Sequence, residues 1–130
     1  MSVKKKVLIV TDGSESVKLI AQSLEKGLTG FSVNVCTAEK FNGTDLLAAD
    51  AFFLGCEKSS PASFSYLQKM LSHINLAGRK CGVFSNNEKA VKYLKSILKD
   101  SEVLISEPIL AADGKIRAPS LKKLIKETLN

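Results

Sequence analysis

The stretch VLIVTDGSESVKLIA, from Val7 to Ala21, joins two different hydrophobic patterns. Its first four residues are all apolar, which is typical of a strand that is buried on both faces of a parallel sheet. From Val17 to Leu28 the apolar residues recur at helical spacing, and Gly30 ends the predicted helix. Between strand and helix lies a loop, Thr11 to Ser16, with three hydroxyl side chains and two carboxylates. The start of a helix favours an anion, whereas the carboxylates oppose one.

Four further apolar runs predict strands, and helical patterns separate them. The strands are expected at Ser32 to Cys36, Ala51 to Gly55, Cys81 to Phe84 and Val103 to Ile105. The helices are expected at Thr44 to Ala49, at Phe64 to Ile74, at Ala90 to Leu98 with an opening near Asn86 or Asn87, and at Leu121 to Leu129 after Pro119-Ser120. A fivefold alternation of strand and helix is the pattern of a doubly wound α/β fold.

The sequence therefore predicts a single α/β domain, residues 1–130. The expected architecture is a three-layer sandwich, with a five-stranded parallel sheet in the order 2-1-3-4-5 and helices on both faces. The first and fifth helices are expected on the same face. Right-handed crossovers place the loops that follow the strands along one edge of the sheet, and a binding site is expected there.

The composition of the chain excludes several classes of protein. The 130 residues are 45% hydrophobic, as in an ordinary globular domain. No apolar run approaches the ~20 residues of a membrane span, and the apolar run after Lys4 to Lys6 is too short for a secretory signal. Because Cys36, Cys56 and Cys81 show no CxxC spacing, we expect free buried thiols in a cytoplasmic protein. The single histidine, His73, excludes a site with two imidazoles and is expected at the surface.

The net charge of +6 bears on the kind of partner. Basic residues flank the first strand and recur in the last predicted helix, at Lys122, Lys123 and Lys126. No aromatic residues are interleaved with them as in proteins that bind single-stranded nucleic acid, so we expect no nucleic-acid partner. A positively charged surface instead favours an acidic partner protein.

Three segments of the chain resemble the flavodoxin family. The hydroxyl-rich loop Thr11 to Ser16 stands where that family wraps the phosphate of FMN. The run Asp50 to Cys56 resembles its third strand, which is introduced by Asp and ends in Gly, and Gly78 to Ser85 resembles its fourth strand and the lead-in. The resemblance implies a flavodoxin-like fold, non-covalent binding of FMN and electron transfer to an acidic redox partner.

The resemblance also implies which residues would contact the cofactor. They come from the loops after the first, third and fourth strands: Thr11, Asp12, Gly13, Ser14, Glu15, Ser16, Cys56, Glu57, Lys58, Ser85, Asn86 and Asn87. Successive backbone N–H groups at the start of a helix, together with hydroxyls, can donate to a phosphate. No catalytic residue or metal ligand is expected.

Two features of the sequence depart from the family pattern and leave a second interpretation open. Glu15 stands where the family has a small or amide residue, and a carboxylate ~4 Å from a phosphate costs about 4 kcal/mol at an effective dielectric near 20. That cost is avoided only if Asp12 and Glu15 point into solvent. The chain has no Trp, and the first aromatic residue after the fourth strand is Tyr93. The alternatives are a hydroxyl-rich helix cap and a cofactor-free binding or regulatory module with the same fold.

Other proteins with this topology fit the sequence less well. A response-regulator receiver needs an Asp after the third strand and a Lys after the fifth, where this chain has Gly55-Cys56 and Glu107-Pro108. A Rossmann dehydrogenase needs GxGxxG after the first strand, and no such motif follows Val10. Cys56 has no histidine candidate beside it to act as a base for nucleophilic catalysis.

Overall fold

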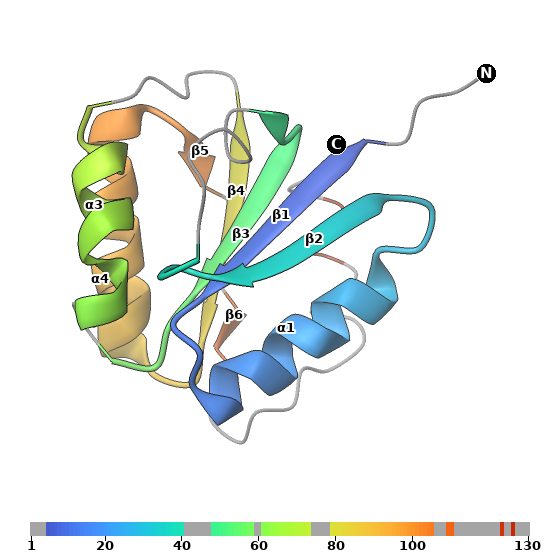
Figure 1. Cartoon of the computed structure of the whole chain (residues 1–130), viewed down its shortest axis with the longest axis horizontal. Helices are drawn as coiled ribbons and strands as arrows, with labels where there is room; N and C mark the ends of the chain where they lie inside the picture. Colours follow the sequence, from blue (N-terminus) through green and yellow to red (C-terminus); the bar gives the residue numbers. More distant parts are fainter. Residues whose placement is uncertain are drawn as a thin grey trace.

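The computed structural model describes residues 5–40, 48–58, 61–73, 79–105 and 109–110, together with Lys123 and Lys126. Its strands are β1 (Lys6–Thr11), β2 (Ser32–Thr37), β3 (Ala51–Gly55), β4 (Lys80–Ser85), β5 (Leu104–Ile105) and β6 (Ile109–Leu110). They form one parallel sheet in the order β2-β1-β3-β4-β5, which confirms the predicted strand order (Figure 1). The short β6 was not predicted, and it pairs with the end of β4 beyond β5.

Helices cover both faces of the sheet, as the sequence predicts. They are α1 (Glu15–Gly27), the 3-10 turn η1 (Ala62–Phe64), α3 (Ser65–Leu71), α4 (Glu88–Leu98) and the 3-10 turn η2 (Lys99–Ser101). Figure 1 shows α1 on one face, and α3 and α4 side by side on the other. Within the described ranges, no helix is long and apolar enough to cross a membrane.

Two of the expected helices lie mostly outside the described residues. Of the helix predicted at Thr44 to Ala49, only its last two residues are described: Ala48 is helical and Ala49 is buried. Of the helix predicted at Leu121 to Leu129, only Lys123 and Lys126 are described, both helical and exposed. The expectation that this last helix lies on the same face as α1 therefore stays a prediction.

The hydrophobic core has two halves because β1 and β3 are covered on both faces. Ile9 and Phe53 pack with the apolar face of α1, whereas Leu8 and Leu54 pack with α3 and α4. Successive side chains of a strand point to opposite faces, so a strand covered on both sides must be apolar at every position. Burial of each such side chain contributes about 1.5–3 kcal/mol. This two-sided burial explains the four consecutive apolar residues that begin at Val7.

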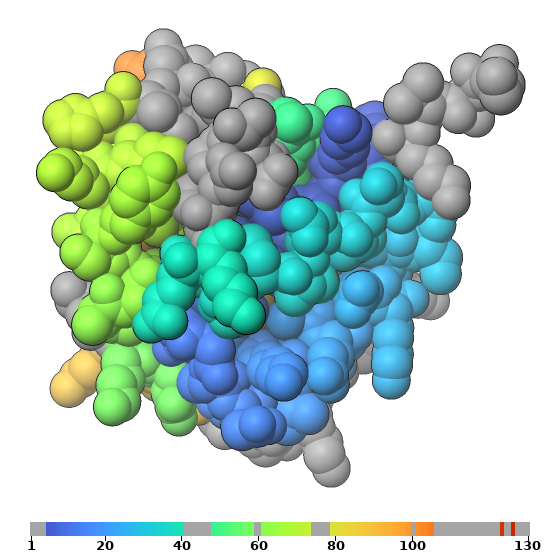
Figure 2. All heavy atoms as spheres, in the orientation of Figure 1, coloured from blue at the N-terminus to red at the C-terminus, as the bar shows by residue number. Residues whose placement is uncertain are grey.

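The second strand is less buried than the sequence suggests. Within the described residues β2 pairs only with β1, so it lies at an edge of the sheet. Asn34 is exposed, and Val35 keeps 41% of its surface accessible. Figure 2 shows β2 at the surface of the molecule. The apolar residues of this strand therefore do not indicate burial on both faces, as those of β1 and β3 do.

Gly55 ends β3 at a place where the chain has no room for a side chain. It is paired with Phe84 of β4, and the Phe84 ring lies across it. A Cβ atom at Gly55 would lie 2.6 Å from Cδ2 of Phe84 and closer still to two neighbouring ring atoms. The glycine thus allows a fully buried aromatic ring to pack directly beneath the ends of β3 and β4.

We expect Gly55→Ala to lower the free energy of unfolding by about 1–3 kcal/mol, because the added methyl displaces the Phe84 ring. Urea denaturation measures this loss. Gly30→Ala is the comparison for backbone strain without a clash: a Cβ there meets nothing within 4 Å, but the positive φ of 88° disfavours a side chain, so this variant loses stability without displacing a ring. The double variant Gly55→Ala/Phe84→Leu should lose less than the sum of its two single variants. Strictly additive losses would contradict the clash.

Candidate functional site

Three loops meet at the carboxyl ends of β1, β3 and β4. The first loop (residues 12–14), the third loop (residues 56–58) and the fourth loop (residues 86–87) each follow one of these strands directly. The strands are neighbours, with Thr11 paired to Gly55 and Gly55 paired to Phe84. Carboxyl ends of adjacent parallel strands are where ligands bind in open α/β sheets. The structure thus brings together the three loops that the sequence singled out.

The carboxylate of Asp12 lies at the centre of this edge. Its Oδ1 accepts hydrogen bonds from the backbone N–H of Ser14 at 3.0 Å and from the Ser14 hydroxyl at 2.7 Å. Its Oδ2 accepts a bond at 2.8 Å from the backbone N–H of Glu57, 45 residues away. The side chain is half-buried. Asp12 therefore does not point into solvent. From the sequence, we expect a phosphate in this loop to require that Asp12 does point into solvent.

Two asparagines of the fourth loop bond to the start of α1 and to the third loop. The Asn86 side-chain amide donates to the Ser16 hydroxyl at 3.0 Å and lies 3.5 Å from a carboxylate oxygen of Glu57. The Asn87 side-chain amide donates to the backbone carbonyl of Glu57. The Asn87 carbonyl oxygen accepts from the backbone N–H of Ala90 at 2.9 Å, so Asn87 also caps α4, as the sequence suggested.

Buried hydroxyls complete the hydrogen bonding beneath the loops. The Ser85 hydroxyl is fully buried and donates to the backbone carbonyl of Cys56 at 2.6 Å. Thr11 was expected in the loop, but it is the last residue of β1 and is only 4% exposed. Its hydroxyl oxygen accepts from the backbone N–H of Gly13 at 3.2 Å. Thr11 thus shapes the turn from inside, a position from which its hydroxyl has little access to a ligand.

The start of α1 lacks the side-chain cap that the sequence suggested as an alternative. Ser14 occupies the N-cap position with extended backbone angles, but its hydroxyl donates to Asp12 and makes no capping bond. Gly13, with φ of 84°, supplies the left-handed turn before it. Glu15 is exposed in the first turn, where the helix dipole favours a negative charge. Lys58 is also exposed.

The thiol of Cys56 is held in its protonated form by its surroundings. It is fully buried, and burial together with the nearby Asp12 carboxylate raises the pKa of Cys56 from 9.0 to about 12. Burial and the proximity of Cys56 likewise raise the pKa of Tyr93 to about 12. Because a thiolate is the nucleophilic form, the raised pKa lowers the nucleophilicity of Cys56 at neutral pH.

The aromatic residues near this edge belong to the packing beneath it. Phe64 is fully buried, and its ring centroid lies 6.3 Å from that of Tyr93. The Tyr93 hydroxyl donates to the side-chain oxygen of Gln68 at 2.9 Å. Residues 12–14, 56–58 and 86–87 include no aromatic side chain, so these loops themselves offer no ring on which a flavin could stack.

The charges of this edge do not fit the phosphate of FMN. Among the donors expected for it, the N–H and the hydroxyl of Ser14 are already bonded to Asp12, whereas no side chain caps the first-turn N–H groups of α1. The carboxylates of Asp12, Glu15 and Glu57 together give the edge a negative charge that repels a phosphate. In the described part of the chain these groups form no cluster suited to a metal ion.

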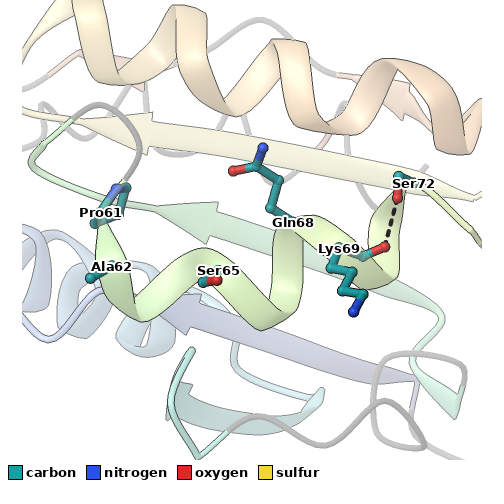
Figure 3. A pocket seen from close by; sticks show the side chains of 6 residues that line it. All are labelled: Pro61, Ala62, Ser65, Gln68, Lys69 and Ser72. Atoms are coloured by element: carbon teal, nitrogen blue, oxygen red, sulfur yellow. Dashed lines mark hydrogen bonds between the residues drawn. The ribbon is translucent and has the colours of Figure 1, made fainter.

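A hollow of about 420 Å³ lies away from the three loops, along η1 and α3 (Figure 3).

Comparison with known proteins identifies the fold. No protein-family model matches the sequence, and no curated protein matches it. A flavodoxin from Streptococcus pneumoniae TIGR4 is similar in structure, with 18% sequence identity, a TM-score of 0.72 and coverage of 95% of this chain and 96% of that one. Flavodoxin 2 from Bacillus cereus matches with 21% identity and a TM-score of 0.72, over 95% of each chain. The chain has a flavodoxin-like fold.

A third flavodoxin-fold structure agrees over nearly the whole chain. It is a short-chain flavodoxin associated with a non-canonical PDU bacterial microcompartment, with 15% identity and a TM-score of 0.69. The alignment covers 98% of this chain and 95% of that one. The flavodoxin-like fold predicted from three short segments is therefore confirmed.

The role of Asp12 is the feature that sequence reasoning missed. Asp12-Gly13-Ser14 is a local signature of an Asx turn, in which the carboxylate accepts from the backbone two residues on. That half of the arrangement was visible in the sequence. The bond from Glu57 joins two loops that only the fold brings together, and no local pattern announces it.

We expect Cys56 to resist alkylation by iodoacetamide at pH 8, where a thiol with a pKa about 12 is ionised in about one molecule in ten thousand. Mass spectrometry after digestion measures labelling at each cysteine, and protein unfolded in urea is the control. Since the folded pKa lies above the unfolded value of 9.0, the folded state binds this proton more tightly, and stability falls as pH rises from 9 toward 12. Labelling of native Cys56 at the rate seen in urea would contradict this.

Proposed function

We propose that this protein is a flavodoxin-fold binding module that works without FMN. The observation that carries the proposal is the position of the Asp12 carboxylate, which accepts three hydrogen bonds from two loops at the edge where a cofactor phosphate would be held. A phosphate in the first loop would compete with this carboxylate for the N–H and the hydroxyl of Ser14. In this proposal the protein acts by binding a partner protein at its surface, and the hydrogen bonds of Asp12 fix the positions of the first and third loops.

Electrostatics supports this proposal over a bound phosphate. A phosphate placed ~4 Å from the Asp12 carboxylate is opposed by about 4 kcal/mol for each pair of unit charges at an effective dielectric near 20. Turning Asp12 away removes the repulsion, but it leaves the N–H groups of Ser14 and Glu57 to be satisfied by the new ligand alone. Exposed Glu15 adds a further negative charge at the start of α1.

The second candidate function is electron transfer by bound FMN. Similarity to flavodoxins over the whole chain supports it, as do the first-turn N–H groups of α1, which no side chain caps. FMN would lie across the three loops, and its phosphate would displace the Asp12 carboxylate from Ser14. When bound, FMN supplies one- and two-electron redox chemistry.

Either function calls for a partner protein, and the net charge of +6 favours an acidic one. Long-range attraction of this kind weakens as salt is added, because the Debye length shortens. We further infer a cytoplasmic location, because all three cysteines are free thiols, which is the usual state in a reducing compartment.

An FMN titration separates the two functions. With the wild-type protein at micromolar concentrations we expect no quenching of FMN fluorescence. Asp12→Ser removes the internal anion and supplies a hydroxyl, so we expect measurable quenching with this variant only. Tight quenching by the wild-type protein would overturn the cofactor-free proposal. In that case Ser14→Ala and Ser16→Ala should each weaken FMN binding about five- to a hundredfold, and Glu15→Gln should strengthen it.

The structural part played by Asp12 is tested by its stability effect. Asp12→Asn replaces one accepting oxygen with an amide that cannot accept from a backbone N–H, and we expect a loss of about 1–3 kcal/mol in the free energy of unfolding. Asp50→Asn is the matched control, because Asp50 also accepts from a backbone N–H, that of Lys6 at 2.7 Å, but at an exposed site. There water can replace the lost bond, so the loss should be smaller. Equal losses in the two variants, measured by urea denaturation, would count against the role given to Asp12.

A further inference from the structure

One helix carries a line of exposed positive charges. The lysine row consists of Lys89, Lys92, Lys95 and Lys99, which follow each other at intervals of three, three and four residues along α4 and into η2. All four side chains are exposed. Residues three and four apart lie on the same side of a helix, so the row spans about 15 Å along one face.

The opposite side of α4 is its buried face. That face consists of Ala90, Val91, Leu94, Ile97 and Leu98, which pack against the sheet and α3. The lysine row therefore points away from the core. Figure 1 shows α4 beside α3, on the face of the sheet opposite to α1.

The charges of the row are not compensated within the described part of the chain, where no carboxylate forms an ion pair with any of the four lysines. Like charges three or four residues apart on a helix destabilise it by about 0.2–0.5 kcal/mol a pair. Acidic residues flank the row at both ends, with Glu88 in the first turn of α4 and Asp100 and Glu102 after Lys99, but none stands between Lys89 and Lys99 in the sequence. By contrast, α1 carries Glu15 and Glu25 along with its lysines Lys18 and Lys26.

We propose that the lysine row is the surface on which an acidic partner protein docks. The inference rests on the proposed function, since it assigns a face to the partner of that binding module. The three-loop edge is a poor place for such a partner, because Asp12, Glu15 and Glu57 would repel its carboxylates. On the lysine row four exposed cations follow each other with no carboxylate between Lys89 and Lys99 in the sequence, so the carboxylates of a partner can be paired there.

The composition of the row favours a protein over other polyanions. It contains no arginine, the side chain that binds phosphates in bidentate fashion, and no exposed aromatic ring on which a base could stack. It also lacks exposed large apolar side chains that would enter a lipid surface. Lysine ammonium groups are compact, strongly hydrated charges, which suit a reversible, salt-sensitive contact with carboxylates.

The test maps a short poly-glutamate peptide onto the full-length protein. Amide shifts of the ¹⁵N-labelled protein, followed by NMR at low salt, should change along α4 between residues 88 and 99 and should fade at higher salt. Lys92→Gln/Lys95→Gln should weaken peptide binding about two- to thirtyfold, as expected for two exposed charge contacts. Lys18→Gln/Lys26→Gln on α1 removes the same charge on the opposite face and should change binding less than about twofold.

Several results would overturn the docking surface. Equal weakening by the two double variants, shifts spread over all exposed lysines, or no shifts at all would each contradict it. So would tighter binding at the row of duplex DNA or of phosphatidylserine vesicles than of the peptide, since these define other partner classes. FMN binding by the wild-type protein would instead overturn the proposed function while leaving the α4 shifts unchanged.

Discussion

Two-sided burial of β1 and β3 is the constraint on which the rest of the structure depends. Because both faces of these strands are covered, by α1 on one side and by α3 and α4 on the other, their only polar surroundings are at the strand ends. The polar side chains of the candidate site therefore lie at or just beyond the carboxyl ends of the strands. At Gly55 the packing leaves no room for any side chain, since even a methyl group there collides with the Phe84 ring. The arrangement of the three loops follows from the packing beneath them.

Asp12 shows how one carboxylate can satisfy several hydrogen-bond donors at the carboxyl edge of the sheet. A helix start and a turn supply N–H donors whatever the side chains are, because the donors belong to the backbone. An aspartate placed among them satisfies these donors with a charge that is part of the chain. The same carboxylate then links the first loop to the third and contributes to the high pKa of Cys56. One side chain therefore affects both the position of the third loop and the pKa of the Cys56 thiol.

Much of the fold could be predicted from the sequence, because the signals were local and repeated. The apolar run at Val7 and the helical spacing after Val17 describe β1 and α1, and their repetition gave the parallel order of the sheet. The exposure of β2 and the additional β6 escaped prediction, because a short apolar run does not show whether a strand lies inside a sheet or at its edge. At the site, the residues were identified but their partners were not. Asp12 and Glu57 are 45 residues apart in the sequence, and only the folded chain brings them within hydrogen-bond distance.

The bonded state of Asp12 has a consequence for how this protein responds to its surroundings. A loop whose donors are satisfied by a dissociable ligand gains stability with ligand concentration by mass action, and loses it when the ligand is scarce. In this chain the satisfying group is covalently attached, so it is present at one copy per molecule under every condition. The hydrogen bonds that join the first loop to the third are therefore present at every ligand concentration.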